Sequence, residues 1–344
     1  MYFRANDIKE LLCAEPDGKE GNYDHLEWSL NGGNDSTDMI SRVISIHEFF
    51  HNDLNNITGY GLLLKAMAYL AGEQTSQKGF FEETLLELVS RCRLAHESFA
   101  TWLSIYAFRE KLDHNPAYIA VENNPEYLNY YRNIDLLLVD IPSVYLRQQV
   151  ATAMLRSCFQ GRQVMEYSLN NLTSFNLAKV TTDEFPDARL DLIFEEFTSN
   201  DPLILIQNSI ETVRSGHEKE LLIRALAGKE DKSALITKDL EWVGKKIMLD
   251  VYHEMIQFFE VRGSRSLQDQ EHLTFISQLL PKLDAIAPFS HSMSPLYENN
   301  KPQDIERGIL INYEKETLIL HPEPWPCIIQ FPEEMNDQAK SLLW

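Results

Sequence analysis

Residues 40–54 read ISRVISIHEFFHNDL, and this stretch decides the local fold and the chemistry that the sequence supports. Its apolar residues and its two histidines recur at steps of three and four, which places them on one face of an α-helix. The preceding residues 34–37, Asn-Asp-Ser-Thr, carry side chains that favour a helix N-terminus. Residues 58–61, Thr-Gly-Tyr-Gly, end or break the helix. We therefore predict a helix that carries both histidines on its packed face.

The same stretch contains the pattern H-E-x-x-H at His47, Glu48 and His51. Side chains four residues apart on a helix project from the same side, so both imidazoles can reach one zinc ion at about 2.0–2.1 Å. Glu48 follows the first histidine and points to the side of the metal, where it can accept a proton from an attacking water. The spacing predicts a Zn²⁺ site with His47 and His51 as ligands and Glu48 as the catalytic base.

A catalytic zinc site needs a third protein ligand, and residues 94–101, LAHESFAT, offer the best one. The run Glu97-Ser98-Phe99-Ala100 resembles the glutamate-zincins, which are H-E-x-x-H metallopeptidases whose third ligand is a glutamate on a later helix. The resemblance covers residues 40–101. It implies that His47, His51 and Glu97 bind zinc, that Glu48 is catalytic, and that the chain is a metallopeptidase.

The sequence leaves two residues of the site undetermined, the third ligand and the group that stabilises the oxyanion. His96 competes with Glu97, because the two side chains leave the helix about 100° apart and the apolar pattern does not choose between them. No second motif identifies a group that would stabilise the oxyanion, for which Tyr106, His217 and His253 are candidates. Zincins also place a twisted sheet before the motif helix, whereas one weak strand candidate, residues 26–30, precedes it here.

The rest of the chain reads as mainly helical with a small β component, so the fold class predicted is α+β with zincin-like active-site helices. A zincin-like catalytic region is expected over residues 1–130, and a helical region with a C-terminal β-hairpin over residues 131–344. Helices are predicted at 80–112, 144–158, 203–213, 218–227 and 240–261, and strands at 309–313, 317–320 and 327–331.

Composition limits the classes of partner. The net charge of −21 opposes binding to phosphate backbones and anionic lipids, so neither nucleic acid nor a membrane is expected. No uncharged apolar run reaches about 18 residues, and the first residues lack the apolar core of a signal peptide. Four dispersed cysteines indicate a reducing compartment. We expect a cytoplasmic protein that acts on a protein or peptide, with a regulatory protein partner at the C-terminal region.

Two other functions compete. A di-metal carboxylate oxidoreductase needs two Glu-x-x-His pairs, and beyond Glu48-x-x-His51 the chain offers Asp250-x-x-His253 and Asp269-x-x-His272. A non-enzymatic helical interaction protein with an inert metal site is the other alternative. Neither a phosphate-binding glycine loop nor a serine-hydrolase elbow is present in the sequence.

Overall fold

The structure is a computed structural model, and it covers several stretches of the chain. The described residues are 21–24, 29–32, 43, 47, 50–51, 53–55, 57–72, 75–109, 121, 124–141, 143–199, 204–205, 220, 238–268, 271–287, 310–313, 316–320 and 327–330. They are mainly helical, which confirms this part of the fold prediction. None of the described helices combines the length and the apolar character that a bilayer crossing requires.

The chain forms two compact units, each built from separate stretches of sequence. The first unit comprises residues 1–90, 163–180 and 267–344, and the second comprises residues 91–162 and 181–266. These units are defined by packing, whereas the boundary predicted at residue 130 separates regions by their expected function. The division into 1–130 and 131–344 stays a prediction.

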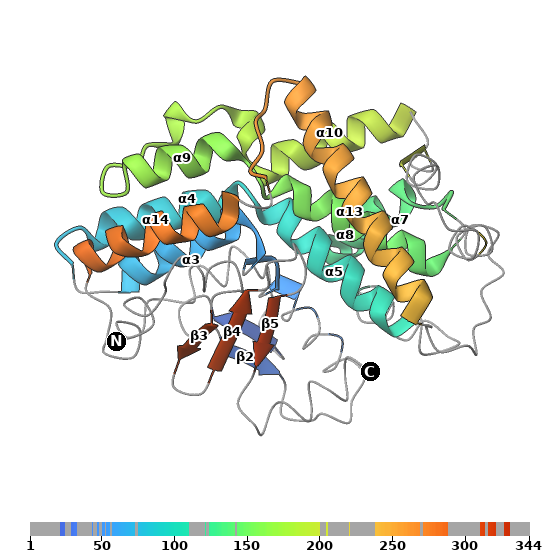
Figure 1. The fold of residues 1–344 in the computed structure, drawn as a ribbon, viewed down its shortest axis with the longest axis horizontal. Helices are drawn as coiled ribbons and strands as arrows, with labels where there is room; N and C mark the ends of the chain where they lie inside the picture. Colours follow the sequence, from blue (N-terminus) through green and yellow to red (C-terminus); the bar gives the residue numbers. More distant parts are fainter. Residues whose placement is uncertain are drawn as a thin grey trace. The chain divides into compact units, whose positions relative to one another are not determined.

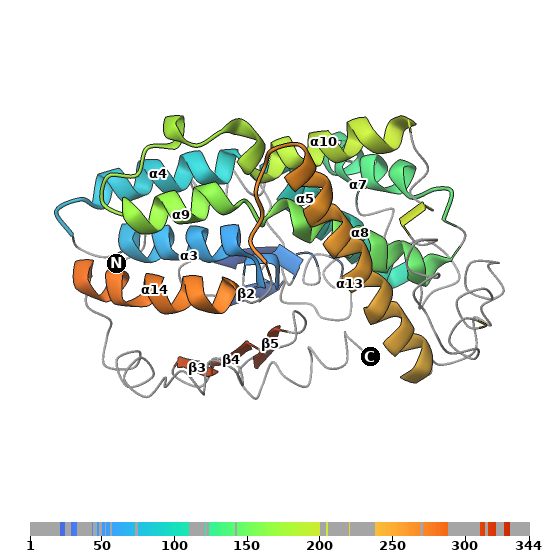
Figure 2. The same ribbon diagram turned by 45° about the horizontal axis from the view of Figure 1, so that its top comes forward.

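Besides the helix that carries His47 and His51, the described residues of the first unit form four α-helices, and these run alongside one another in Figures 1 and 2. Tyr60 of α3 donates a hydrogen bond to the carbonyl of Leu88 in α4 over 2.7 Å, and Tyr69 donates to the carbonyl of Ala287 over 3.0 Å. Lys282 of α14 donates to the carbonyl of Leu169 in α9. The helices are α3 (Gly59–Gly72), α4 (Lys78–Ser90), α9 (Arg162–Asn170) and α14 (Glu271–Ile286), with a 3₁₀ turn η1 (Leu177–Lys179).

The strands also belong to the first unit and form two antiparallel sheets. The two-stranded sheet pairs β1 with β2 in a register that sets Gly21 opposite Gly32. The three-stranded sheet has the order β3-β4-β5, with Leu310 opposite Ile319 and Thr317 opposite Gln330. The strands are β1 (Gly21–Asp24), β2 (Ser29–Gly32), β3 (Leu310–Tyr313), β4 (Glu316–Leu320) and β5 (Cys327–Gln330).

In the second unit, α13 packs along α8 and α7 packs along α5. Local sequence explains where two of them begin. The Asn124 side chain accepts hydrogen bonds from the first turn of α7, where Pro125 fixes the backbone, and Ser143 does the same for α8. The elements are α5 (Arg93–Arg109), α7 (Pro125–Leu137), α8 (Val144–Cys158), η2 (Thr182–Glu184), α10 (Pro186–Ser199) and α13 (Lys238–Val261).

A buried arginine forms the polar centre of the second unit. Arg189 is fully buried, its guanidinium lies 4.5 Å from the ring centre of Phe259, and burial lowers its pKa. Five hydrogen bonds compensate the loss of water around this charge, as a buried cation requires. The acceptors are the carbonyls of Ser157, Asp183 and Arg265 and the hydroxyls of Ser264 and Ser266.

The single helix predicted over residues 80–112 is wrong. Helix α4 ends at Ser90, a turn occupies Arg91 and Cys92, and α5 starts at Arg93. The apolar pattern continues across this turn, which is why the sequence suggests one helix. The N-terminus of α5 is stabilised by a residue far along the chain, as described below.

Candidate metal centre

The two motif histidines lie on a helix, as predicted. Val43, His47, His51 and Leu54 are all helical and all buried, so the face with the three-and-four spacing is the packed face. The helix breaks at Thr58, whose hydroxyl donates to the carbonyl of Leu54 over 2.6 Å. The position of the break confirms the prediction from residues 58–61.

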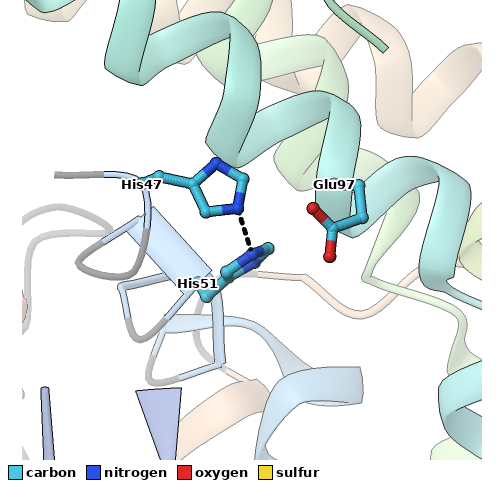
Figure 3. A group of neighbouring side chains, drawn as sticks. All are labelled: His47, His51 and Glu97. Carbon is cyan, nitrogen blue, oxygen red and sulfur yellow. Dashed lines mark hydrogen bonds between the residues drawn. The ribbon is translucent and has the colours of Figure 1, made fainter. Parts of the chain in front are cut away.

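The imidazoles of the two histidines converge, as Figure 3 shows. Their Nε2 atoms are 2.8 Å apart, and the rings meet edge to face with centroids 4.4 Å apart. His47 is 7% exposed and His51 is 1% exposed. Two nitrogen atoms bound to one tetrahedral zinc lie roughly 3.3 Å apart, given bonds of 2.0–2.1 Å. A separation of about half an ångström more would therefore admit the ion.

Glu97 supplies a carboxylate to the same cluster. It lies in the second turn of α5, is 1% exposed, and directs its carboxylate toward the two imidazoles in Figure 3. One ligand atom from each of His47, His51 and Glu97 can be chosen so that all three lie within 4.8 Å of one another. These are the three residues that the sequence and the resemblance select as ligands.

His96 occupies a different environment from Glu97. It is fully buried, and its ring packs against Phe159 with centroids 5.7 Å apart. The metal-competent group formed by the described residues contains Glu97 and does not contain His96. The structure therefore favours Glu97 over His96 as a member of this group, and its role as a metal ligand stays a prediction.

The donor set of the cluster fits zinc. Two imidazole nitrogens and one carboxylate oxygen are the ligands of many catalytic zinc sites, and three protein ligands leave one position for water. A bound cation would offset the cost of placing the buried Glu97 carboxylate out of water.

Helix α5 is held at its start by Asp187, which lies in the first turn of α10. The Asp187 carboxylate accepts hydrogen bonds from the backbone N–H of Ala95 over 2.8 Å and of Leu94 over 3.2 Å. Removal from water raises the pKa of Asp187 to about 6, although these two bonds act in the opposite direction. Sequence reasoning missed this residue, because nothing near α5 in the chain signals a cap from a position more than ninety residues away.

A hydrogen-bonded group from α5 and α7 lies near Glu97. Tyr130 donates to the Glu126 carboxylate over 2.7 Å, and Arg93 binds the same carboxylate over 2.8 Å. Burial raises the pKa of Tyr130, and the charges of Glu97 and Glu126 raise it further. The Tyr130 phenol therefore stays a neutral hydrogen-bond donor to Glu126.

The remaining sequence candidates are Glu48, Tyr106, His217 and His253. Glu48 and His217 lie outside the described residues. Tyr106 is nine residues beyond Glu97, which turns it roughly 180° around the helix, and its ring stacks on Trp102 with centroids 4.2 Å apart. His253 is exposed on α13. The rotation turns Tyr106 away from the side of α5 that carries Glu97, and the oxyanion role of His253 stays a prediction.

The di-metal alternative gains no support from the described residues. Asp250 forms an ion pair with Lys246 over 2.7 Å, and its motif partner His253 is exposed. Asp269, from the other candidate pair, lies outside the described residues. Among those that the structure covers, His47, His51 and Glu97 form the group able to hold a metal.

Comparison of the chain with known protein families, with curated proteins and with solved structures finds no match.

Proposed function

We propose that this chain is a zinc-dependent hydrolase of the metallopeptidase type, with His47, His51 and Glu97 as the metal ligands. The observation that carries the proposal is the meeting of these three buried side chains, whose ligand atoms lie within 4.8 Å of one another. Two of them come from the H-E-x-x-H pattern and the third from a helix that starts more than forty residues later. The same three residues are predicted as ligands from the sequence, which supports a functional site over a chance cluster.

The chemistry that the site would perform follows from its residues. Zinc, when bound there, would polarise the scissile carbonyl and lower the pKa of water to around 7. The two imidazoles and the Glu97 carboxylate would hold the ion and leave one position open. Because the two imidazoles are neutral and only one ligand is a carboxylate, the bound zinc site would keep a net positive charge. Polarisation of the carbonyl requires this charge.

Glu48 is the residue we propose as the general base. It directly follows His47 in the sequence. On a helix, its side chain is therefore expected to project about 100° away from that of His47, to the side of the metal. In peptide hydrolysis the water oxygen bonds to the carbonyl carbon and its proton passes to Glu48. The carbon–nitrogen bond then breaks, and Glu48 returns the proton to the departing amine. A protein or peptide is the substrate class proposed.

The experiment is a comparison of turnover and metal content in one variant of Glu48. The zinc-loaded chain is incubated with a mixture of peptides of diverse sequence, and new termini are identified by mass spectrometry. Glu48→Gln keeps the side-chain shape and removes the base, so we expect one zinc per chain and turnover reduced by about 10²-fold or more. Glu83→Gln changes an exposed glutamate of α4 in the same way and should behave as the wild type.

Two results would contradict the proposal. Full activity of Glu48→Gln would show that this residue is not the base. A wild-type chain that binds zinc and cleaves no peptide in the mixture would favour the inert metal site of an interaction protein.

A further inference from the structure

The first turn of α5 carries backbone N–H groups that the helix cannot satisfy itself. Two of them, those of Leu94 and Ala95, are bound by the two carboxylate oxygens of Asp187, one oxygen to each N–H. The carboxylate also lies at the positive end of the helix dipole. A single side chain from α10 therefore holds the start of the helix that carries Glu97.

The start of α5 and the segment that leads into α10 form hydrogen bonds in both directions. The backbone N–H of Asp187 donates to the carbonyl of Arg91 over 3.1 Å. The guanidinium of Arg91 lies 5.3 Å from the ring centre of Phe185, which is buried. Residues on both sides of the start of α5 are thus bound to the segment that leads into α10.

Glu97 follows Ala95 by two residues, so the position of its carboxylate depends on where this first turn is held. A zinc–oxygen bond tolerates deviations of only about 0.2 Å, and small shifts of a supporting residue weaken metal binding. Burial raises the pKa of the Cys92 thiol, and the charges of Asp187 and Glu97 raise it further.

We propose that Asp187 is the positioning residue for the metal ligand Glu97, acting through the backbone N–H groups of Leu94 and Ala95. The inference rests on the proposed function. It adds a residue of α10 to the metal centre, without contact to the ion. Loss of its two acceptors would let the start of α5 shift, and Glu97 would then bind zinc less tightly.

The test measures zinc affinity and stability separately. The zinc dissociation constant is determined by competition with a chromophoric chelator, and the free energy of unfolding of the metal-free chain by urea denaturation. For Asp187→Ala we expect zinc affinity to fall about 10- to 100-fold, as for other groups that orient a ligand. For Asp187→Asn, which keeps one acceptor oxygen, we expect a smaller loss.

Ser143→Ala is the matched control. Ser143 caps α8 through the N–H of Leu146 over 3.2 Å, so the variant also removes a helix cap inside the second unit. It should lower the free energy of unfolding as Asp187→Ala does and leave zinc affinity within about twofold of the wild type. A parallel loss of zinc affinity in both variants would reduce Asp187 to a general structural role and overturn the inference.

Two further outcomes are decisive. If Asp187→Ala binds zinc as tightly as the wild type, the positioning role is wrong and the metal centre stands. If the wild type binds no zinc, the proposed function fails and the inference falls with it. Should Asp187→Ala not fold, Asp187→Asn against Ser143→Ala decides, with a zinc affinity at least about threefold weaker expected for Asp187→Asn.

Discussion

Asp187 combines a raised pKa with hydrogen bonds from two backbone N–H donors, so its ionisation is coupled to the stability of the fold. Loss of water raises its pKa to about 6 from an ordinary value of 3.8. The hydrogen bonds from Leu94 and Ala95 and the charge of Arg93 lower the pKa, whereas the charge of Asp191 raises it. The net effect is that the folded chain holds this proton more tightly than the unfolded chain does.

This shift predicts a pH dependence of stability. The contribution is fully present below about pH 4 and is lost as the pH rises through about 6. After allowance for the partial exposure of Asp187, the loss amounts to about 1–2 kcal/mol. We expect the free energy of unfolding of the wild type to fall by this amount relative to Asp187→Asn between pH 4 and pH 7, measured by urea denaturation with EDTA present. A difference between the two proteins that stays constant over this range would contradict the assignment.

For single residues, the sequence predicts the three members of the cluster and does not predict Asp187, which holds the start of the helix that carries Glu97. His47 and His51 follow from helical spacing, and Glu97 follows from a short pattern that resembles the glutamate-zincins. The choice of Glu97 over His96 needs the structure, because a rotation of 100° around a helix decides it and the apolar pattern is mixed. Asp187 is not predictable, since its partners are backbone N–H groups 92 and 93 positions away.

Among the elements, the junction between the histidine helix and α3 depends on one glycine. A Cβ atom at Gly61 would lie 2.3 Å from the Cα of Asn55 and 2.7 Å from its carbonyl oxygen. The Gly61 N–H also donates to the hydroxyl of Thr58 over 3.1 Å, which closes the turn between the two helices. The backbone at Asn55 cannot withdraw as a flexible side chain would.

We therefore expect opposite effects from two glycine substitutions. Gly61→Ala should lower the free energy of unfolding by about 1–3 kcal/mol or more, because backbone atoms would overlap. Gly79→Ala, at an exposed position of α4 where a Cβ would meet nothing within 4 Å, should raise it by about 0.5–1 kcal/mol through helix propensity. Urea denaturation of the two variants checks both signs. A neutral or stabilising Gly61→Ala would show that the helices at this junction are not held in close contact.

Element prediction from the sequence succeeds where a local signal marks each end. Helix α8 spans Val144–Cys158, as predicted, and its start carries the cap Ser143. Helix α13, Lys238–Val261, begins two residues before the predicted start at residue 240 and ends at the predicted residue. The single helix predicted over 80–112 fails because the signal that separates α4 from α5 comes from Asp187 in another segment. Local periodicity carries no information about such long-range partners.

For the whole molecule, the sequence predicts a mainly helical chain, and the described residues confirm it. It does not predict that each compact unit draws on separate stretches of sequence, such as 1–90 with 163–180 and 267–344. Packing between distant segments decides this assembly, and composition and periodicity describe only neighbours. The division by function, the general base Glu48 and the substrate class remain predictions.

The zinc content of the chain decides whether His47, His51 and Glu97 form a metal centre. The purified chain is incubated with zinc, freed of excess by desalting, and analysed for metal by mass spectrometry. We predict one zinc per wild-type chain and loss of that zinc in His51→Ala, because two protein ligands cannot retain it. His253→Ala removes an exposed histidine outside the cluster and should keep the metal. A folded wild type without stoichiometric zinc would contradict a zinc site at these three residues. A His51→Ala variant with an undiminished zinc content would contradict it equally.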